Sequence, residues 1–327
     1  MKPLALIFCF FALLGIAQAQ QPVLKPDSKT AGDEAKNQAK LHKMMEVDVN
    51  APAAKFIKPQ VLHFPLRIGI ITNKEKPQYP TEAQLNTTIA RLNKGFQRAY
   101  MQFHIALVDT IFSDYTLENL SDDGYMPYIN MSRQLDLKDT ISLYLLDYNP
   151  NFCKVTENSV SCGRQAGFSY ILSQETNNIV MSKFDLDDHK VVTHEFGHFF
   201  GLYHTFEEKF GRELPNGEKC ETTGDLLCDT PADPGSVYEI YVNHSTCDMI
   251  NNYHEKTDSY YKPLISNYMA YYKPCYMREF TFTQGQNRLL FMSSHSDLRR
   301  HFAEAPPPPA APAEPAPLTP SVKPSSR

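Results

Sequence analysis

The residue pattern from His194 to His204 constrains this chain more than any other feature of its sequence. Residues 191–206 read VVTHEFGHFFGLYHTF, in which H-E-x-x-H continues as x-x-G-x-x-H. In a helix, positions i and i+4 lie on one face, so His194 and His198 can reach the same ion. Gly201 falls where such a helix should end, because glycine accepts a left-handed backbone conformation. The chain can then turn back and present His204 as a third nitrogen ligand.

Three neutral imidazoles with one open position form the ligand set of a catalytic zinc ion, so we expect one Zn²⁺ here. Glu195 follows the first ligand, and the pattern predicts that it acts as the general base on a metal-activated water. The predicted reaction is hydrolysis of internal peptide bonds, in which the same carboxyl protonates the leaving amine. The alternative is an amphipathic helix with ordinary histidines, because its other residues supply much apolar surface. That alternative would suffice for one histidine, whereas the complete spacing favours the metal site.

The first nineteen residues have the features of an export signal. Lys2 gives a short positive start, residues 4–16 are apolar, and Ala17-Gln18-Ala19 is a small-residue cleavage pattern. The apolar run is too short for a comfortable membrane span, which disfavours a membrane anchor. We therefore expect a signal peptide over 1–19, a secreted, extracellular product and no stable membrane insertion after its removal. The net charge of −5 gives no support for nucleic acid as a partner.

Composition divides the rest of the chain into three parts. Residues 20–55 contain no aromatic residue and are predicted to be a leader or pro-segment. Residues 56–302 form the predicted catalytic domain. Residues 303–327 are predicted to be a disordered tail, because the nine prolines within 305–327 favour an extended chain over a packed core.

The hydrophobic pattern of the central region alternates between strand-like and helix-like segments. Strands are expected over 61–72, 105–112 and 140–148, a short edge strand over 178–181, and helices over 82–100 and 128–135. This alternation predicts an α/β layer with a mixed sheet. An edge strand near residues 178–181 would be able to pair with an extended peptide.

Four further segments resemble the metzincin zinc peptidases and, among them, the pappalysin family in its small cytophagalysin-type members. They are GLYHTF at 201–206, GDLLCDTP at 224–231, NYMAY at 267–271 and FTQGQNRL at 282–289. The resemblance covers roughly residues 139–301. It implies an α/β (α+β) zincin domain, with the mixed sheet and active-site helix above an irregular, disulfide-stapled lower subdomain. The implied activity is that of a zinc metalloendopeptidase on protein or peptide substrates; the alternative is a catalytically inactive peptide- or protein-binding relative.

The resemblance also implies roles for individual residues. Met269 would form a hydrophobic floor beneath the zinc site, and Tyr271 would help to stabilise the oxyanion of the tetrahedral intermediate. Ordinary core packing is the alternative for Tyr271. The loop over 224–231 offers Asp225, Asp229 and Thr230 as oxygen ligands for a structural Ca²⁺, with a solvated acidic turn as the alternative.

Removal of the signal leaves six cysteines, and an even number in an exported chain predicts disulfide bonds. They are Cys153, Cys162, Cys220, Cys228, Cys247 and Cys275. Counting alone allows 15 pairings. The family resemblance favours Cys220 with Cys247 and Cys228 with Cys275, which leaves Cys153 with Cys162.

Overall fold

The computed structural model of the chain describes most of the region between residues 59 and 304 and six residues of the expected leader. The described residues are 36, 37, 39–41, 43, 59–112, 135–147, 151–156, 159–164, 166–173, 176–188, 190–235, 242–249, 259–275 and 278–304. Within 151–164 the description covers the backbone alone. The expected signal peptide, nearly all of the short helix expected over 128–135 and the segment 305–327 lie outside the described residues.

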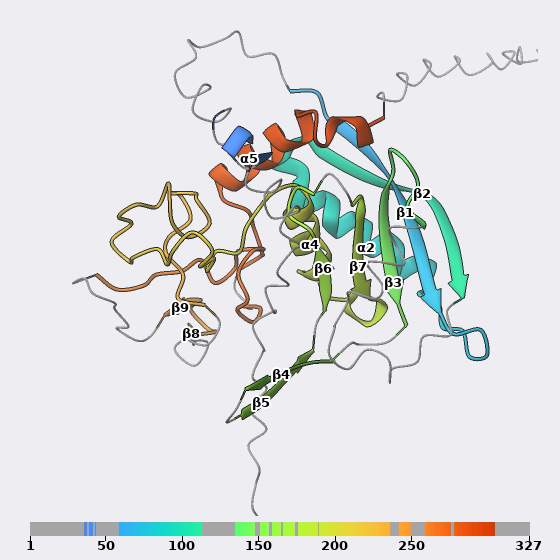
Figure 1. Ribbon diagram of the computed structural model, residues 1–327, viewed down its shortest axis with the longest axis horizontal. Coiled ribbons are helices and arrows are strands. Elements are labelled where there is room, and N and C mark those ends of the chain that lie inside the picture. Colours follow the sequence, from blue (N-terminus) through green and yellow to red (C-terminus); the bar gives the residue numbers. More distant parts are fainter. Residues whose placement is uncertain are drawn as a thin grey trace, which may run out of the picture.

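A five-stranded mixed sheet forms one side of the molecule, in the order β2-β1-β3-β7-β6 (Figure 1). The strands are β1 (Leu62–Thr72), β2 (Met101–Phe112), β3 (Ile141–Leu146), β6 (Gly167–Ser169) and β7 (Asn178–Ser182). β2, β1, β3 and β7 are parallel, whereas β6 runs antiparallel to β7. The mixed sheet predicted from the sequence is therefore confirmed.

The strand expected at the edge of the sheet, over 178–181, is instead an interior strand. β7 pairs with β3 on one side and with β6 on the other, so β6 forms this edge. β6 directly precedes β7, and a short connection favours an antiparallel pair. With three residues, β6 is too short for an alternating pattern to indicate it.

Helix α2 (Glu82–Phe96) lies on one face of the sheet and confirms most of the helix expected over 82–100. It begins with a capping box, in which Thr81 and Gln84 exchange side-chain and backbone hydrogen bonds. The 3₁₀ turn Gln97–Ala99 follows, and the left-handed conformation of Tyr100, at φ 56°, ends the helical segment.

Helices α4 (Val191–Phe199) and α5 (Gln284–His295) complete the core. Every residue of α4 from Val192 to Phe199 is buried, as a helix between a sheet and other elements must be. α5 begins with a second capping box, formed by Thr283 and Gln286, and is followed by the 3₁₀ turn Arg300–Phe302. The C-terminal end of the domain is thus helical in two pieces.

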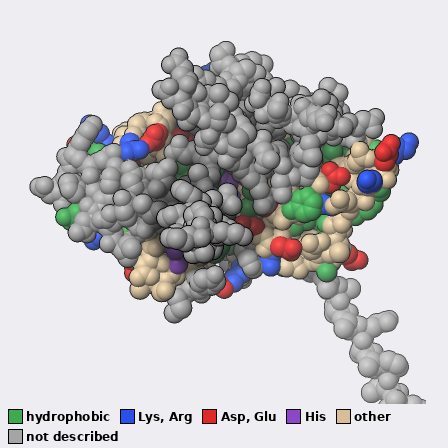
Figure 2. Space-filling model, turned by 90° about the horizontal axis from the view of Figure 1, so that it is seen from below, with side chains coloured by type: hydrophobic (Ala, Val, Ile, Leu, Met, Phe, Trp, Pro, Cys, Tyr) green, Lys and Arg blue, Asp and Glu red, His purple; other side chains and the backbone are tan. Residues whose placement is uncertain are grey.

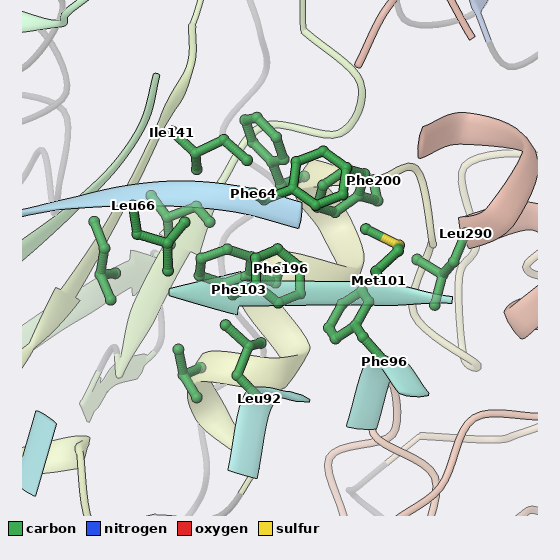
Figure 3. Close-up of a cluster of buried hydrophobic side chains, with 14 of the residues drawn as sticks. Phe64, Leu66, Leu92, Phe96, Met101, Phe103, Ile141, Phe196, Phe200 and Leu290 are labelled. Atoms are coloured by element: carbon green, nitrogen blue, oxygen red, sulfur yellow. The ribbon is translucent and has the colours of Figure 1, made fainter. Parts of the chain in front are cut away.

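Five phenylalanines fix α4 to the sheet and to α2 (Figure 3). Phe103 of β2 lies with its ring centroid 5.5 Å from Phe64 of β1, 5.2 Å from Phe96 of α2 and 5.1 Å from Phe196 of α4. Phe200, just beyond α4, packs edge-on against Phe64 at 5.4 Å. The edge-to-face pairs in this cluster are favoured geometries for buried aromatic rings. This cluster supplies the large aromatic packing in a chain that has no tryptophan.

The region after α4 is irregular, as expected for the lower subdomain. Its described strands, β8 (Val242–Asn243) and β9 (Asp248–Met249), have two residues each and pair with one another. Upstream, β4 (Asn151–Thr156) and β5 (Ser159–Arg164) form a hairpin that the sequence did not indicate. Its register places Cys153 opposite Cys162. The bond predicted between them concerns side chains outside the description.

Two disulfide pairings expected from the resemblance are wrong. Cys220 is bonded to Cys228, and Cys247 is bonded to Cys275, rather than Cys220 to Cys247 and Cys228 to Cys275. Left-handed residues between 217 and 226 turn the chain sharply, so the Cα atoms of Cys220 and Cys228 lie 5.0 Å apart. The Cα atoms of Cys247 and Cys275 lie 5.7 Å apart, and both distances are typical of a disulfide. Disulfide bonds do hold the lower region together, but each joins two cysteines that are consecutive in this part of the sequence.

Part of the expected leader contacts the folded domain. Leu41 is fully buried against Leu172 and Leu298. The amide of Asn37 donates a hydrogen bond of 3.0 Å to the carbonyl of Leu172. Lys40 forms an exposed ion pair with Asp297, which adds little to stability. The described leader residues therefore dock on the segment after β6 and on the end of α5.

On the face that Figure 2 shows, the described residues carry charges of both signs. In Figure 2, acidic and basic side chains are scattered among polar residues and small groups of hydrophobic ones. Over the described ranges, no helix has the length and apolar character needed to cross a membrane.

Candidate metal centre

The Nε2 atoms of His194, His198 and His204 converge on one point. The distances are 3.0 Å from His198 to each of the other two and 3.2 Å from His194 to His204. Three ligands at zinc–nitrogen distances of about 2.0–2.1 Å in tetrahedral geometry lie roughly 3.3 Å apart, so the triad fits a zinc ion. Within the described part of the chain, it is the one group of three or more His, Cys, Asp or Glu side chains found with this geometry.

The end of α4 brings the third histidine to the other two. Gly201 has φ 105°, a conformation that few residues other than glycine adopt. A Cβ atom at this position would also lie 2.8 Å from a methyl carbon of Leu172. The amide of Leu202 donates to the carbonyl of Gly197 at 2.9 Å, which closes the helix end. The chain reverses here as predicted, and His204 faces the helix.

Backbone carbonyls orient the two helical ligands. Nδ1 of His194 lies 2.7 Å from the carbonyl oxygen of Tyr268, and Nδ1 of His198 lies 2.7 Å from that of Leu202. An Nδ1–H that donates to a carbonyl leaves the Nε2 lone pair free for a metal.

The surroundings of the triad keep its imidazoles neutral. Burial lowers the pKa of His198 to about 4 and lowers the pKa of His194 and His204 well below the usual value. The charges of neighbouring histidines and of Lys190 lower the pKa of His194 and His204 further. Neutral imidazole is the form that binds a metal.

Glu195 lies against the edge strand β6. Its side chain is buried, at 1% exposure, and a Cβ atom at position 167 would lie 2.8 Å from its Cγ and its Oε1. Gly167 therefore permits the backbone of β6 to approach the carboxylate closely. No sequence pattern indicates this residue, because it lies 28 positions before Glu195 and belongs to a strand of three residues.

Tyr271 stands beside the triad, as the resemblance implied. Its ring centroid lies 5.4 Å from that of His194 and 4.8 Å from that of His204. Its hydroxyl oxygen is buried and forms no hydrogen bond to any residue that the structure describes. Burial raises the pKa of Tyr271 well above its usual value, and the charges of Glu195 and Glu207 raise it further. The phenol is therefore protonated and has a donor directed at no described acceptor.

Met269 is fully buried and packs directly against α4. A Cβ atom at Gly197 would lie 2.6 Å from the Met269 sulfur, so glycine in the helix permits this contact. The side chain of Asn267 accepts a hydrogen bond from the amide of Met269 at 2.8 Å. Asn267 also bonds to Gln286 of the α5 capping box, at 2.8 and 3.2 Å. The turn around Met269 is thus held between α4 and α5.

Both candidate carboxylates for a calcium ion have hydrogen-bond partners within the protein. Both oxygens of Asp229 accept hydrogen bonds at the start of α5, from Thr283 at 3.1 Å and from the amide of Gly285 at 2.6 Å. Oδ1 of Asp225 accepts from the amide of Leu227 at 3.1 Å. This geometry gives no support for a structural Ca²⁺, because the carboxylate of Asp229 accepts its hydrogen bonds from the N-terminal end of α5, which carries partial positive charge.

A pair of buried acids that the sequence did not indicate lies in the same loop. Glu213 and Asp225 are 5% and 2% exposed. Burial raises the pKa of Glu213 to about 7. Burial also raises the pKa of Asp225 well above its usual value, and the charge of Glu213 raises it further.

Comparison with known proteins agrees with this geometry. Residues 171–292 match the pappalysin family model, described as "Pregnancy-associated plasma protein-A". Residues 82–205 match a model described as "Metallo-peptidase family M12B Reprolysin-like". Each model covers less than half of the chain, and both are models of metallopeptidases, in line with the resemblance predicted from the sequence.

Relatives named "Extracellular metalloprotease" occur in fungi. One from Colletotrichum graminicola is 28% identical over 199 residues, which cover 57% of this chain and 66% of the relative. One from Arthroderma otae is 31% identical over 103 residues, covering 28% and 34%. The chain thus spans less than two thirds of the length of these relatives.

A solved structure has a similar fold. Mature mirolysin of Tannerella forsythia, in complex with a cleaved peptide, matches with a TM-score of 0.50 and 17% identity. The match covers 75% of this chain and 96% of that structure. The predicted metzincin-like fold class is therefore confirmed.

Replacement of Gly167 by alanine is expected to displace Glu195. The added Cβ would meet Cγ and Oε1 at 2.8 Å, and a misplacement of about 1 Å near reacting groups can cost about 10²-fold in rate. We expect kcat for peptide cleavage to fall at least tenfold while zinc content stays at one ion per chain. Phe168→Leu, which alters the cluster on the other face of the sheet, is the control. An unchanged kcat in Gly167→Ala would contradict the contact.

The buried acids make stability depend on pH. Because folding raises the pKa of Glu213 from 4.5 to about 7, the folded state binds this proton more tightly. Its stabilising contribution is complete below pH 4.5 and is lost as pH rises through 7. The free energy of unfolding of the wild type should fall by up to about 3 kcal/mol over this pH range because of Glu213. We expect Glu213→Gln to remove this fall, measured by urea unfolding at several pH values. Glu221→Gln, at an exposed position, should keep the wild-type slope; identical slopes in both variants would refute the assignment.

Proposed function

We propose that this chain is a secreted zinc-dependent endopeptidase that hydrolyses internal peptide bonds in proteins or peptides. The observation that carries the proposal is the convergence of three Nε2 atoms beside the buried carboxylate of Glu195. The names of the fungal relatives support an extracellular location, in line with the export signal expected over residues 1–19.

The chain supplies a binding site for one Zn²⁺ through His194, His198 and His204. When bound, zinc lowers the pKa of a water molecule and polarises the scissile carbonyl. Glu195 accepts the proton of the attacking water and later delivers it to the leaving amine, so one carboxyl acts as base and then as acid. Its burial strengthens these interactions, because the local dielectric is low.

Tyr271 donates a hydrogen bond to the oxyanion that forms during attack. Three features support this role: its place beside His194 and His204, its buried hydroxyl with no described partner, and its raised pKa. A donor that is already in place where negative charge develops stabilises the transition state more than the ground state.

The substrate backbone pairs with the outer side of β6 as an added strand. We assign this role to β6 instead of residues 178–181, since β7 is enclosed between two strands. β6 lies against Glu195 through Gly167, so a peptide along this edge passes close to the general base. Main-chain hydrogen bonds of this kind hold an extended peptide whatever its side chains.

Glu195→Gln tests the proposal most directly. The amide cannot accept the proton of water, so we expect cleavage of a mixed protein substrate to fall by about 10²–10⁴-fold. Zinc content should remain at one ion per chain, because Glu195 is not among the ligands. A chelated wild-type sample is the second inactive control.

A zinc-loaded wild-type chain that cleaves nothing, even without residues 20–55, would overturn the proposal. A peptide- or protein-binding relative without activity would then be the better description.

Tyr271→Phe removes the hydroxyl and keeps the ring that packs against His204. We expect kcat to fall by about 10²-fold or more with KM changed little, because the lost bond exists in the transition state. Tyr268→Phe is the matched control, since the backbone carbonyl of Tyr268, and not its phenol, contacts His194. An equal loss in both variants would favour ordinary packing for Tyr271.

A further inference from the structure

We propose that Asp233 is a positioning residue that holds His204 and Tyr271 in place relative to one another, an inference that rests on the function proposed above. Its carboxylate is 5% exposed and accepts three hydrogen bonds. Oδ2 accepts from the hydroxyl of Thr205 at 2.5 Å. Oδ1 accepts from the hydroxyl of Tyr272 at 2.6 Å and from the amide of Gly235 at 2.8 Å.

The two hydroxyl partners directly follow the two residues that face the metal centre. Thr205 is next to His204, and Tyr272 is next to Tyr271. Thr205 and Tyr272 are 2% and 1% exposed, so neither hydroxyl can exchange its partner freely with water. Asp233 thus joins two segments that are 67 residues apart in the chain.

The third ligand needs this connection more than the other two do. His194 and His198 each have a backbone carbonyl 2.7 Å from Nδ1. Nδ1 of His204 makes no hydrogen bond to a residue that the structure describes. Its ring is held by stacking on Phe206, with centroids 4.8 Å apart, and by the edge-on contact with Tyr271. The orientation of His204 therefore depends on how its backbone is anchored, and Thr205 provides that anchor.

The hydrogen bonds around Asp233 offset part of the cost of burying a carboxylate. A buried carboxylate is stable only where donors or a positive charge replace water. Burial raises the pKa of Asp233, and its three hydrogen bonds and the charge of Lys190 oppose that rise. Lys190, just before α4, also donates a hydrogen bond of 3.2 Å to the carbonyl of Tyr272. The three hydrogen bonds hold the carboxylate between the two segments.

Asp233→Asn is the first variant, because it keeps the shape of the side chain and removes the charge and one acceptor. Zinc affinity is measured by competition of the zinc-loaded chain with a chelator, and kcat, KM and Tm are measured beside it. Loss of such an outer contact typically lowers metal affinity by about 10–100-fold. We expect a loss in this range, together with a fall in kcat that exceeds any change in KM.

Two further variants separate the two halves of the link. Thr205→Val releases the ligand side and should weaken zinc binding. Tyr272→Phe releases the other side and should lower kcat at least fivefold, with zinc affinity close to that of the wild type. Tyr261→Phe is the matched control: its hydroxyl is also buried in the lower region but donates to the carbonyl of Glu213, away from the centre.

The outcomes distinguish this inference from the proposed function. Wild-type zinc affinity and kcat in Asp233→Asn would overturn the inference while the proposed function stands. So would losses in Thr205→Val and Tyr272→Phe that only follow Tm and are matched by Tyr261→Phe. If Asp233→Asn does not fold, the two single-sided variants decide the question. A wild-type chain that neither retains zinc nor cleaves peptides would instead refute the proposed function itself.

Discussion

The close contact between Gly201 and Leu172 is the constraint on which the metal centre depends. It lets the chain reverse immediately after α4, and without that reversal His204 would not return to the face that carries His194 and His198. Leu172 has its own left-handed backbone, at φ 48°, and follows β6 by three residues. The same contact therefore fixes the end of the active-site helix and the exit of the edge strand. A side chain at position 201 would disturb both at once.

Around that constraint, several buried polar groups are matched with a backbone group or a second side chain. Backbone carbonyls accept hydrogen bonds from His194 and His198. The side chains of Asn267 and Gln286 are hydrogen-bonded to one another next to the Met269 turn. Asp233 accepts hydrogen bonds from two hydroxyl groups. Such pairs compensate the loss of hydration and leave few alternative arrangements. The hydroxyl of Tyr271 is among the buried atoms without such a partner in the described residues, and its place beside the three histidines is the reason for the role proposed for it above.

The sequence predicted those features that depend on local pattern. The i, i+4 spacing and Gly201 located the ligands, and the apolar runs located β1, β3 and α2. It did not predict features that depend on contacts between distant segments. β6 is too short to leave a pattern, and the approach of Gly167 to Glu195 exists only in three dimensions. Asp229 looked like a metal ligand because acidic side chains suit both calcium and the start of a helix, and only the position of α5 decides between them. The disulfide pairing failed because left-handed turns after residue 216 bring near neighbours together.

The pairing of Cys220 with Cys228 and of Cys247 with Cys275 has a consequence for how the chain acquires its bonds. The two loops close over 8 and 28 residues and do not overlap along the sequence. Short loops close easily, because the entropy lost on closure grows with loop length. Each bond therefore joins two cysteines that are consecutive within this region. Closure of the 8-residue loop first leaves Cys247 and Cys275 as the remaining pair of this region, which favours the observed bonds.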